Sequence, residues 1–119
     1  MLSLSAATRV FVYSEPCDMR CSFRKLIALT KHAVGEDPLS GHLFLFLNRP
    51  QTSVKILMWD RTGFAIWYKR LEQGTFSKPN EKEINYRELM CVLEGIERKE
   101  ICMKKRYSLR RDSACEARI

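Results

Sequence analysis

Long apolar runs are missing from this chain of 119 residues, in which the longest one lies around Leu43–Leu47. A helix that crosses a bilayer needs about 20 predominantly apolar residues. The first residues, MLSLSAATR, also lack the basic stretch followed by a long apolar core that marks a signal peptide. We therefore expect a cytoplasmic protein that contacts no membrane.

Glycine is scarce as well, because the chain has only five glycines and they are isolated from one another. None of them stands in the GxxxxGK pattern whose backbone cradles a nucleotide phosphate. No serine or cysteine has the glycine-flanked setting of a nucleophile elbow. These absences predict a protein that is not an enzyme and that needs no cofactor.

The acidic residues give little support for a catalytic site. Nucleases and transposases hold Mg²⁺ with a cluster of carboxylates, for which Asp18, Asp60 and Glu72 are the candidates. Asp18 has the position of a helix N-cap, and Asp60 stands in a turn, where aspartate is favoured for its backbone hydrogen bonds. A metal-dependent nuclease would require these three side chains to converge, and we expect that they do not.

The five cysteines form no regular framework. Cys17 and Cys21 are four positions apart, which is wider than the spacing of a typical zinc-binding pair. Only His32 and His42 could complete a metal site. We expect free thiols, as in a reducing compartment, and no bound metal.

The composition is that of a soluble globular protein, with 45% apolar and 29% charged residues. We expect a single domain over residues 1–97, followed by a basic and flexible tail over residues 98–119. The tail carries eight Lys or Arg against three acids, and the whole chain has a net charge of +7. This balance favours a polyanionic partner, because phosphate neutralisation with release of counterions dominates the affinity for nucleic acid.

The stretch Gly41–Leu71 predicts three strands of an antiparallel meander. Its apolar runs are His42–Leu47, Val54–Trp59 and Phe64–Lys69, and turn-forming residues separate them. Connections this short cannot make a parallel crossover. A further β-prone run, Arg9–Tyr13, is expected to add an N-terminal strand to the same sheet.

Two helices are expected beside this sheet. Met19–Val34 places its apolar residues on one face at helical spacing, with Asp18 as N-cap and a following glycine as C-cap. Tyr86–Leu93 follows Asn85, which together with Glu88 has the spacing of a capping box. The expected fold class is α+β: a small antiparallel sheet, one main amphipathic helix packed on it, and a second short C-terminal helix.

Candidate contacts to nucleic acid come from both kinds of element. On the main helix, basic residues line one edge of the apolar stripe, and the alternative interpretation is an ordinary solvated flank. In the strands, single basic residues stand among apolar ones. The predicted nucleic-acid-binding residues are Arg20, Arg24, Lys31, Lys55, Lys69 and Arg70.

The aromatic residues of the meander also have two interpretations. Tryptophan and tyrosine interleaved with Lys and Arg can form stacking platforms for single-stranded nucleic acid, whereas aromatic residues on strands usually pack in the core. Alternation along Phe64–Lys69 puts Trp67 and Tyr68 on opposite faces. We expect core packing to be their main role, with one of the two, not both, available at a surface.

Several blocks of residues, in order and at matching spacing from about Val10 to Leu93, resemble one family of transposon proteins. They are Asp18-Met19-Arg20 with Ser22-Phe23, Gly41-His42-Leu43-Phe44, Trp59-Asp60 with Gly63-Phe64, Trp67-Tyr68-Lys69-Arg70-Leu71-Glu72, and Gly74 with Phe76. On these blocks the chain is similar to the accessory protein TnpB of the insertion-sequence-66 family of bacterial transposons. That family is unrelated to the RNA-guided nuclease of the same name.

The resemblance implies a small protein that is encoded beside a separate transposase, supports efficient transposition and does not cut DNA strands itself. The chain departs from the family pattern in its main helix, where Phe23-Arg24-Lys25-Leu26 replaces a sequence like FDGL. Its first hairpin is less basic than usual, and Lys78 stands where a tryptophan is common. The positions that transfer most directly are Asp18, Met19, Arg20, Trp59, Asp60, Tyr68, Lys69 and Arg70.

Together these observations predict a non-catalytic transposition accessory factor that binds DNA through a basic surface. The alternative is a protein-interaction module that docks on the partner transposase without contacting DNA. The expected partners are therefore DNA, the transposase and other proteins of the same element.

Overall fold

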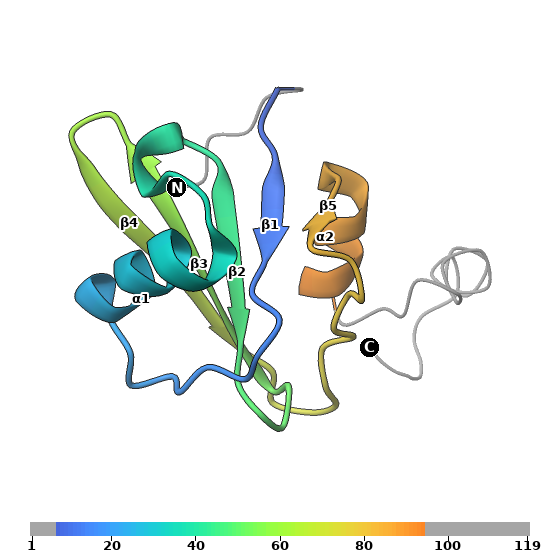
Figure 1. The fold of residues 1–119 in the computed structure, drawn as a ribbon. Coiled ribbons are helices and arrows are strands. Elements are labelled where there is room, and N and C mark those ends of the chain that lie inside the picture. The colour runs from blue at the N-terminus through green and yellow to red at the C-terminus, as the bar shows by residue number, and fades with distance from the viewer. Residues whose placement is uncertain (1–6, 95–119) are drawn as a thin grey trace.

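The computed structural model describes residues 7–94, which form a five-stranded sheet in the order β4-β3-β2-β1-β5 (Figure 1). The strands are β1 (Val10–Val12), β2 (Leu43–Leu47), β3 (Ser53–Asp60), β4 (Gly63–Arg70) and β5 (Glu83–Ile84). The helical elements are α1 (Phe23–Leu29), its π-helical continuation η1 (Thr30–Val34), the 3₁₀ turn η2 (Pro38–Ser40) and α2 (Tyr86–Leu93). The predicted α+β fold class is confirmed.

The predicted meander is present as β2, β3 and β4, which pair in antiparallel register. The first turn is closed by Asn48, whose Oδ1 accepts hydrogen bonds from the backbone N–H groups of Thr52 and Ser53 at 2.9 and 3.1 Å. The second connection has only two residues between Asp60 and Gly63. Local turn chemistry therefore sets the strand register, as expected for short hairpins.

The N-terminal strand joins the sheet in a direction that the sequence did not reveal. β1 lies parallel to β2, with Val10 beside Leu43 and Val12 beside Leu45, so the sheet as a whole is mixed. The α1–η1 segment supplies the long crossover that a parallel pair requires. On its other side β1 pairs antiparallel with the two-residue β5, which was not predicted.

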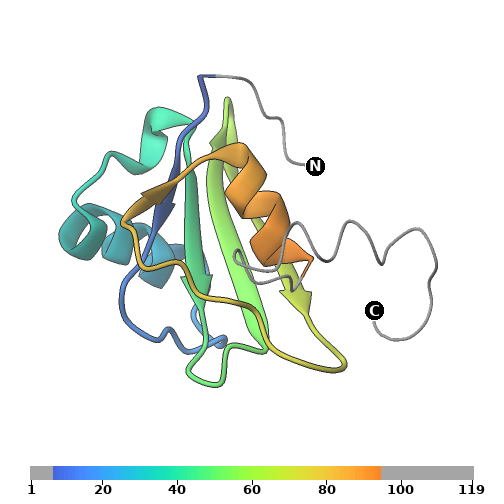
Figure 2. The ribbon, with the colours of Figure 1, turned by 90° about the vertical axis from the view of Figure 1, so that its right-hand side faces the viewer.

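Both faces of the central strands are buried, and Figure 2 shows α1 and α2 on opposite sides of the sheet. The α1 face is built on aromatic side chains, with Leu26 of α1 packed against Phe11, Phe44 and Phe46. The α2 face contains smaller aliphatic side chains with Phe76. Its buried members are Val10, Val12, Leu43, Leu45, Leu47, Val54, Ile56, Met58, Phe76, Ile84, Leu89, Val92 and Leu93. Cover on both faces explains why every residue of β2 is apolar.

The predicted start of the first helix is wrong by four residues. α1 begins at Phe23 rather than Met19, and its N-cap is Ser22, whose side chain makes no capping hydrogen bond. The Asp18 carboxylate instead accepts the backbone N–H of Arg20 at 2.8 Å and so stabilises a turn before the helix. The predicted end is confirmed, because Gly35 adopts the left-handed conformation with φ of 79°.

The second helix follows the prediction closely. Asn85 accepts the backbone N–H of Glu88 at 2.8 Å, and Glu88 accepts that of Asn85 at 3.2 Å, which completes the capping box. The predicted domain boundary at residue 97 and the predicted basic tail over 98–119 lie outside the described residues. Within residues 7–94, no helix is long and apolar enough to span a bilayer.

Candidate nucleic-acid interface

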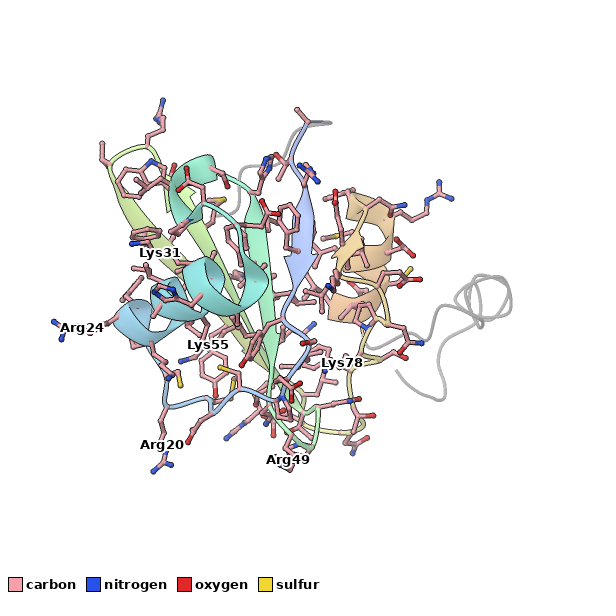
Figure 3. The ribbon with its side chains drawn as sticks, in the orientation of Figure 1. Arg20, Arg24, Lys31, Arg49, Lys55 and Lys78 are labelled. Atoms are coloured by element: carbon pink, nitrogen blue, oxygen red, sulfur yellow. The ribbon has the colours of Figure 1, made fainter. Side chains whose placement is uncertain are left out.

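The outer side of α1 and η1 carries exposed cations. Arg24, Lys25 and Lys31 are all exposed, and none of the three forms an ion pair with any residue between 7 and 94. Figure 3 shows the Arg24 side chain pointing away from the sheet. The stretch 19–35 contains no acidic residue at all. We call these three residues the helical basic surface; Lys25 was not among the predicted site residues.

Arg20 lies in the loop before α1 and is 92% exposed. Its Nη2 is 2.7 Å from Oδ2 of Asp18. The side-chain hydrogen bond from Arg20 lowers the pKa of Asp18 to about 2. The carboxylate is therefore ionised at neutral pH and offsets part of the Arg20 charge, while leaving most of the guanidinium open to solvent.

Lys55 is buried and is occupied within the protein. Its Nζ donates hydrogen bonds to the carbonyl oxygens of Met19 and Cys21, at 2.7 Å each. The same ammonium lies 4.9 Å from the ring centroid of Tyr68. Lys55 thus fastens the loop before α1 to β3 and leaves no free ammonium for a phosphate, in contrast to its predicted role.

Lys69 and Arg70, the other two predicted contacts, separate onto different faces. Lys69 points to the α2 side, where its Nζ donates to the carbonyl oxygen of Leu93 at 2.8 Å. A cation at this last turn also complements the helix dipole. Arg70 points to the α1 side, stays 68% exposed and has its Nη2 3.8 Å from Glu72. Arg70 therefore lies on the α1 face of the sheet, whereas Lys69 lies on the opposite face.

Arg49 is an exposed cation that was overlooked in the sequence. It lies in the β2–β3 turn, at the same end of the molecule as Arg20 (Figure 3). A shallow depression lies between the turn and the loop before α1, and Asp18, Met19, Asn48 and Arg49 line it together with Pro16 and Cys17. Arg49 stands in a short turn between two apolar strands. This position in the sequence is the signal from which its exposure could have been predicted.

The three candidate carboxylates are not brought together. Asp18 lines the depression beside the β2–β3 turn, whereas Asp60 lies at the far end of β3. At about 3.3 Å per residue, the strand separates its two ends by roughly 23 Å. Among residues 7–94 no group of three or more His, Cys, Asp or Glu side chains is placed to hold a metal ion.

The cysteines of the described chain are free thiols: Cys17, Cys21 and Cys91. Cys17 belongs to the loop before α1 and is buried, and this burial, with Cys21 close by, raises its pKa to about 12. A thiol that stays protonated at neutral pH is a poor nucleophile. Cys17 therefore acts as a core residue on the α1 face.

Comparison with known proteins settles the relationship that the residue blocks suggested. The family model described as IS66 Orf2 like protein matches residues 8–103. The chain belongs to the IS66 Orf2-like family. This membership implies an accessory role in the transposition of an insertion sequence.

Two relatives from Sinorhizobium fredii (strain NBRC 101917 / NGR234) are similar over most of their length. The uncharacterized protein y4hO is 31% identical over 101 residues, which cover 82% of this IS66 Orf2-like chain and 88% of the relative. The uncharacterized protein y4jC is 31% identical over 83 residues, which cover 70% and 71%. No solved structure matches the chain.

Proposed function

We propose that this IS66 Orf2-like protein assists transposition without cutting DNA itself, and that it binds DNA through the helical basic surface of Arg24, Lys25 and Lys31. The observation that supports this proposal is their exposure on an acid-free stretch, without ion-pair partners among residues 7–94. Cations without a partner are the side chains that displace counterions from phosphates.

The spacing of these cations suits a DNA backbone. Arg24 and Lys31 are seven residues apart, which corresponds to roughly 10 Å along a helix. One strand of B-DNA carries a phosphate about every 3.4 Å along the axis, so this separation spans about three phosphates. Lys25 adds a neighbouring contact. Such contacts position a protein on DNA but carry no sequence information.

A salt titration tests the proposal. Fluorescence anisotropy of a labelled duplex, measured over a range of salt, gives the slope of log Kobs against log salt. In the double variant Arg24→Gln/Lys31→Gln we expect the slope to become shallower by about 1.8, because each phosphate contact contributes about 0.9. The matched control is Lys82→Gln/Arg87→Gln, which removes two exposed cations at the β5–α2 edge.

The control variant should keep the wild-type slope. A wild-type slope near zero, or equal slopes for the wild type and the Arg24→Gln/Lys31→Gln variant, would remove the phosphate-contact proposal. Either result would leave the transposition accessory role implied by the family without a direct DNA contact on this surface.

The second candidate function is docking on the partner transposase, and an exposed apolar residue favours it. Phe23 begins α1, is 43% exposed and precedes Arg24 directly. An apolar side chain beside cations suits an interface with an acidic and partly apolar protein surface. Co-purification with the transposase in the presence of nuclease tests this function, and loss of the complex in Arg24→Gln/Lys31→Gln would support it.

A further inference from the structure

Tyr68 is an exposed aromatic residue that the proposed contacts of α1 do not use. It lies in β4 on the α1 side of the sheet and is 52% exposed, whereas Trp67 beside it is partly buried against the α2-side core. This agrees with the expectation that only one of the two is available. Tyr68 lies near the end of the edge strand β4, and its exposure leaves part of the ring available to a partner.

Lys55 in β3, the cross-strand neighbour of Tyr68, contacts the Tyr68 ring. The ammonium lies over one face of the ring at 4.9 Å from the centroid, and it is itself held by two carbonyl oxygens of the loop before α1. A fixed cation on one face restricts the ring. Because β4 is an edge strand, no further strand covers the ring, which stays half exposed. A preorganised ring loses less conformational freedom when a flat ligand stacks on it.

Two exposed arginines flank this ring. Arg70 is two residues along β4 on the same face, about 7 Å from Tyr68 between Cα atoms. Arg20 lies between Met19 and Cys21, the two residues whose carbonyls hold Lys55 next to the ring. Each arginine has one acidic neighbour, yet they stay 92% and 68% exposed. Both exposed cations therefore come from segments that adjoin the ring, Arg70 from β4 itself and Arg20 from the loop that holds Lys55.

We propose that Tyr68, Arg20 and Arg70 form a subsite for single-stranded DNA. An unpaired base stacks on the open face of Tyr68, and neighbouring phosphates of the same strand contact the arginines. Duplex DNA does not fit this arrangement, because its base faces are already stacked on one another. The proposal rests on the proposed function, in that it requires a DNA-binding protein, and it adds the form of DNA that this surface accepts.

The experiment compares two probes of equal length, a fluorescein-labelled oligothymidylate and a labelled oligonucleotide made of abasic sites. Binding of each probe to the full-length protein is measured by anisotropy for the wild type, Tyr68→Ala and Tyr68→Phe. The matched control is Tyr86→Ala, since Tyr86 is also 52% exposed but begins α2 on the other side of the sheet.

The expected result is a loss of about five- to 140-fold in affinity for oligothymidylate in Tyr68→Ala, which is the effect of removing one stacked base. Tyr68→Phe keeps the ring and should bind within about two-fold of the wild type. Tyr86→Ala should bind like the wild type. The abasic probe should bind all four proteins equally, because it offers phosphates but no bases.

Several outcomes would overturn the subsite. One is unchanged binding of oligothymidylate by Tyr68→Ala, and another is an equal loss on the abasic probe. Loss of transposase binding in Tyr68→Ala with oligothymidylate binding intact would reassign the ring to protein docking. Tyr68→Leu, which keeps apolar bulk over Lys55 but has no aromatic face, separates stacking from folding, and thermal melting followed by circular dichroism checks each variant.

Failure of the subsite and failure of the proposed function give different results. If duplex binding keeps its salt slope while Tyr68→Ala binds oligothymidylate normally, only the single-strand subsite is wrong. If neither duplex nor oligothymidylate binds with a measurable salt slope, both proposals are wrong.

Discussion

At the scale of single residues, Lys55 and Lys69 show that a strand lysine can bind the backbone of a segment packed on the sheet instead of pointing into solvent. Both stand in strands where an exposed cation was expected, and both donate instead to backbone carbonyls of a neighbouring segment. Alternation along a strand tells which face a side chain lies on. Alternation does not reveal which segment packs on that face. The loop before α1 accepts the hydrogen bonds of Lys55, and the last turn of α2 accepts that of Lys69.

The buried role of Lys55 leads to a stability prediction. Lys55→Met keeps the length of the side chain but leaves the carbonyls of Met19 and Cys21 without their donor. We expect the free energy of unfolding to fall by about 1–3 kcal/mol, the usual penalty for part-buried groups that lose their partner. Urea denaturation of the variant and the wild type measures this change.

Lys31→Met is the matched control, since Lys31 is exposed and has no ion-pair partner in the part of the chain that the structure describes. Its free energy of unfolding should stay within about 0.5 kcal/mol of the wild type. If the two variants were equally stable, the two short hydrogen bonds of Lys55 would not hold the loop in solution.

At the scale of elements, local patterns predicted what local interactions build. The meander and the capping box of α2 depend on contacts a few residues apart, and both were found from the sequence. The parallel direction of β1 depends on where the α1 crossover ends, which no local pattern records. β5 is only two residues long and lies in a charged stretch, so its pairing with β1 could not be predicted.

The two helix starts offer a direct comparison of capping. Asn85→Ala removes the side-chain acceptor of a complete capping box and should lower the free energy of unfolding by about 1 kcal/mol. Ser22→Ala changes an N-cap residue whose side chain makes no capping hydrogen bond, so it should have little effect. Thermal melts of both variants measure the difference, and an equal shift would show that Ser22 caps α1 in solution.

At the scale of the whole molecule, the candidate site comes from elements that the fold places on one side. Arg20, Arg24 and Lys31 were predicted from the sequence and are exposed on the α1 side together with Arg70. The contact of Tyr68 with the buried Lys55 depends on the pairing of β3 with β4 and on the loop before α1. Exposed charge on a helix can thus be predicted from spacing, whereas a platform formed by three segments requires the tertiary structure.

The two-sided cover predicts how local stability is distributed. Residues of β2 and the first part of β3 are buried on both faces, so their backbone amides should exchange only on global unfolding. The edge pair of β1 with β5 should exchange faster, since β5 has two residues. Hydrogen exchange followed by mass spectrometry measures both, and faster exchange in β2 than in β5 would contradict the prediction.

Val10 in β1 pairs with Ile84 in β5, so the sheet cannot be completed until the ribosome has synthesised residue 84. The first strand is synthesised early, whereas β5, which covers its edge, and α2 come last among the elements of residues 7–94. Until then the nascent meander keeps the apolar side that α2 later covers in contact with water. A premature stop codon before residue 83 would therefore yield an aggregation-prone fragment rather than a smaller working protein.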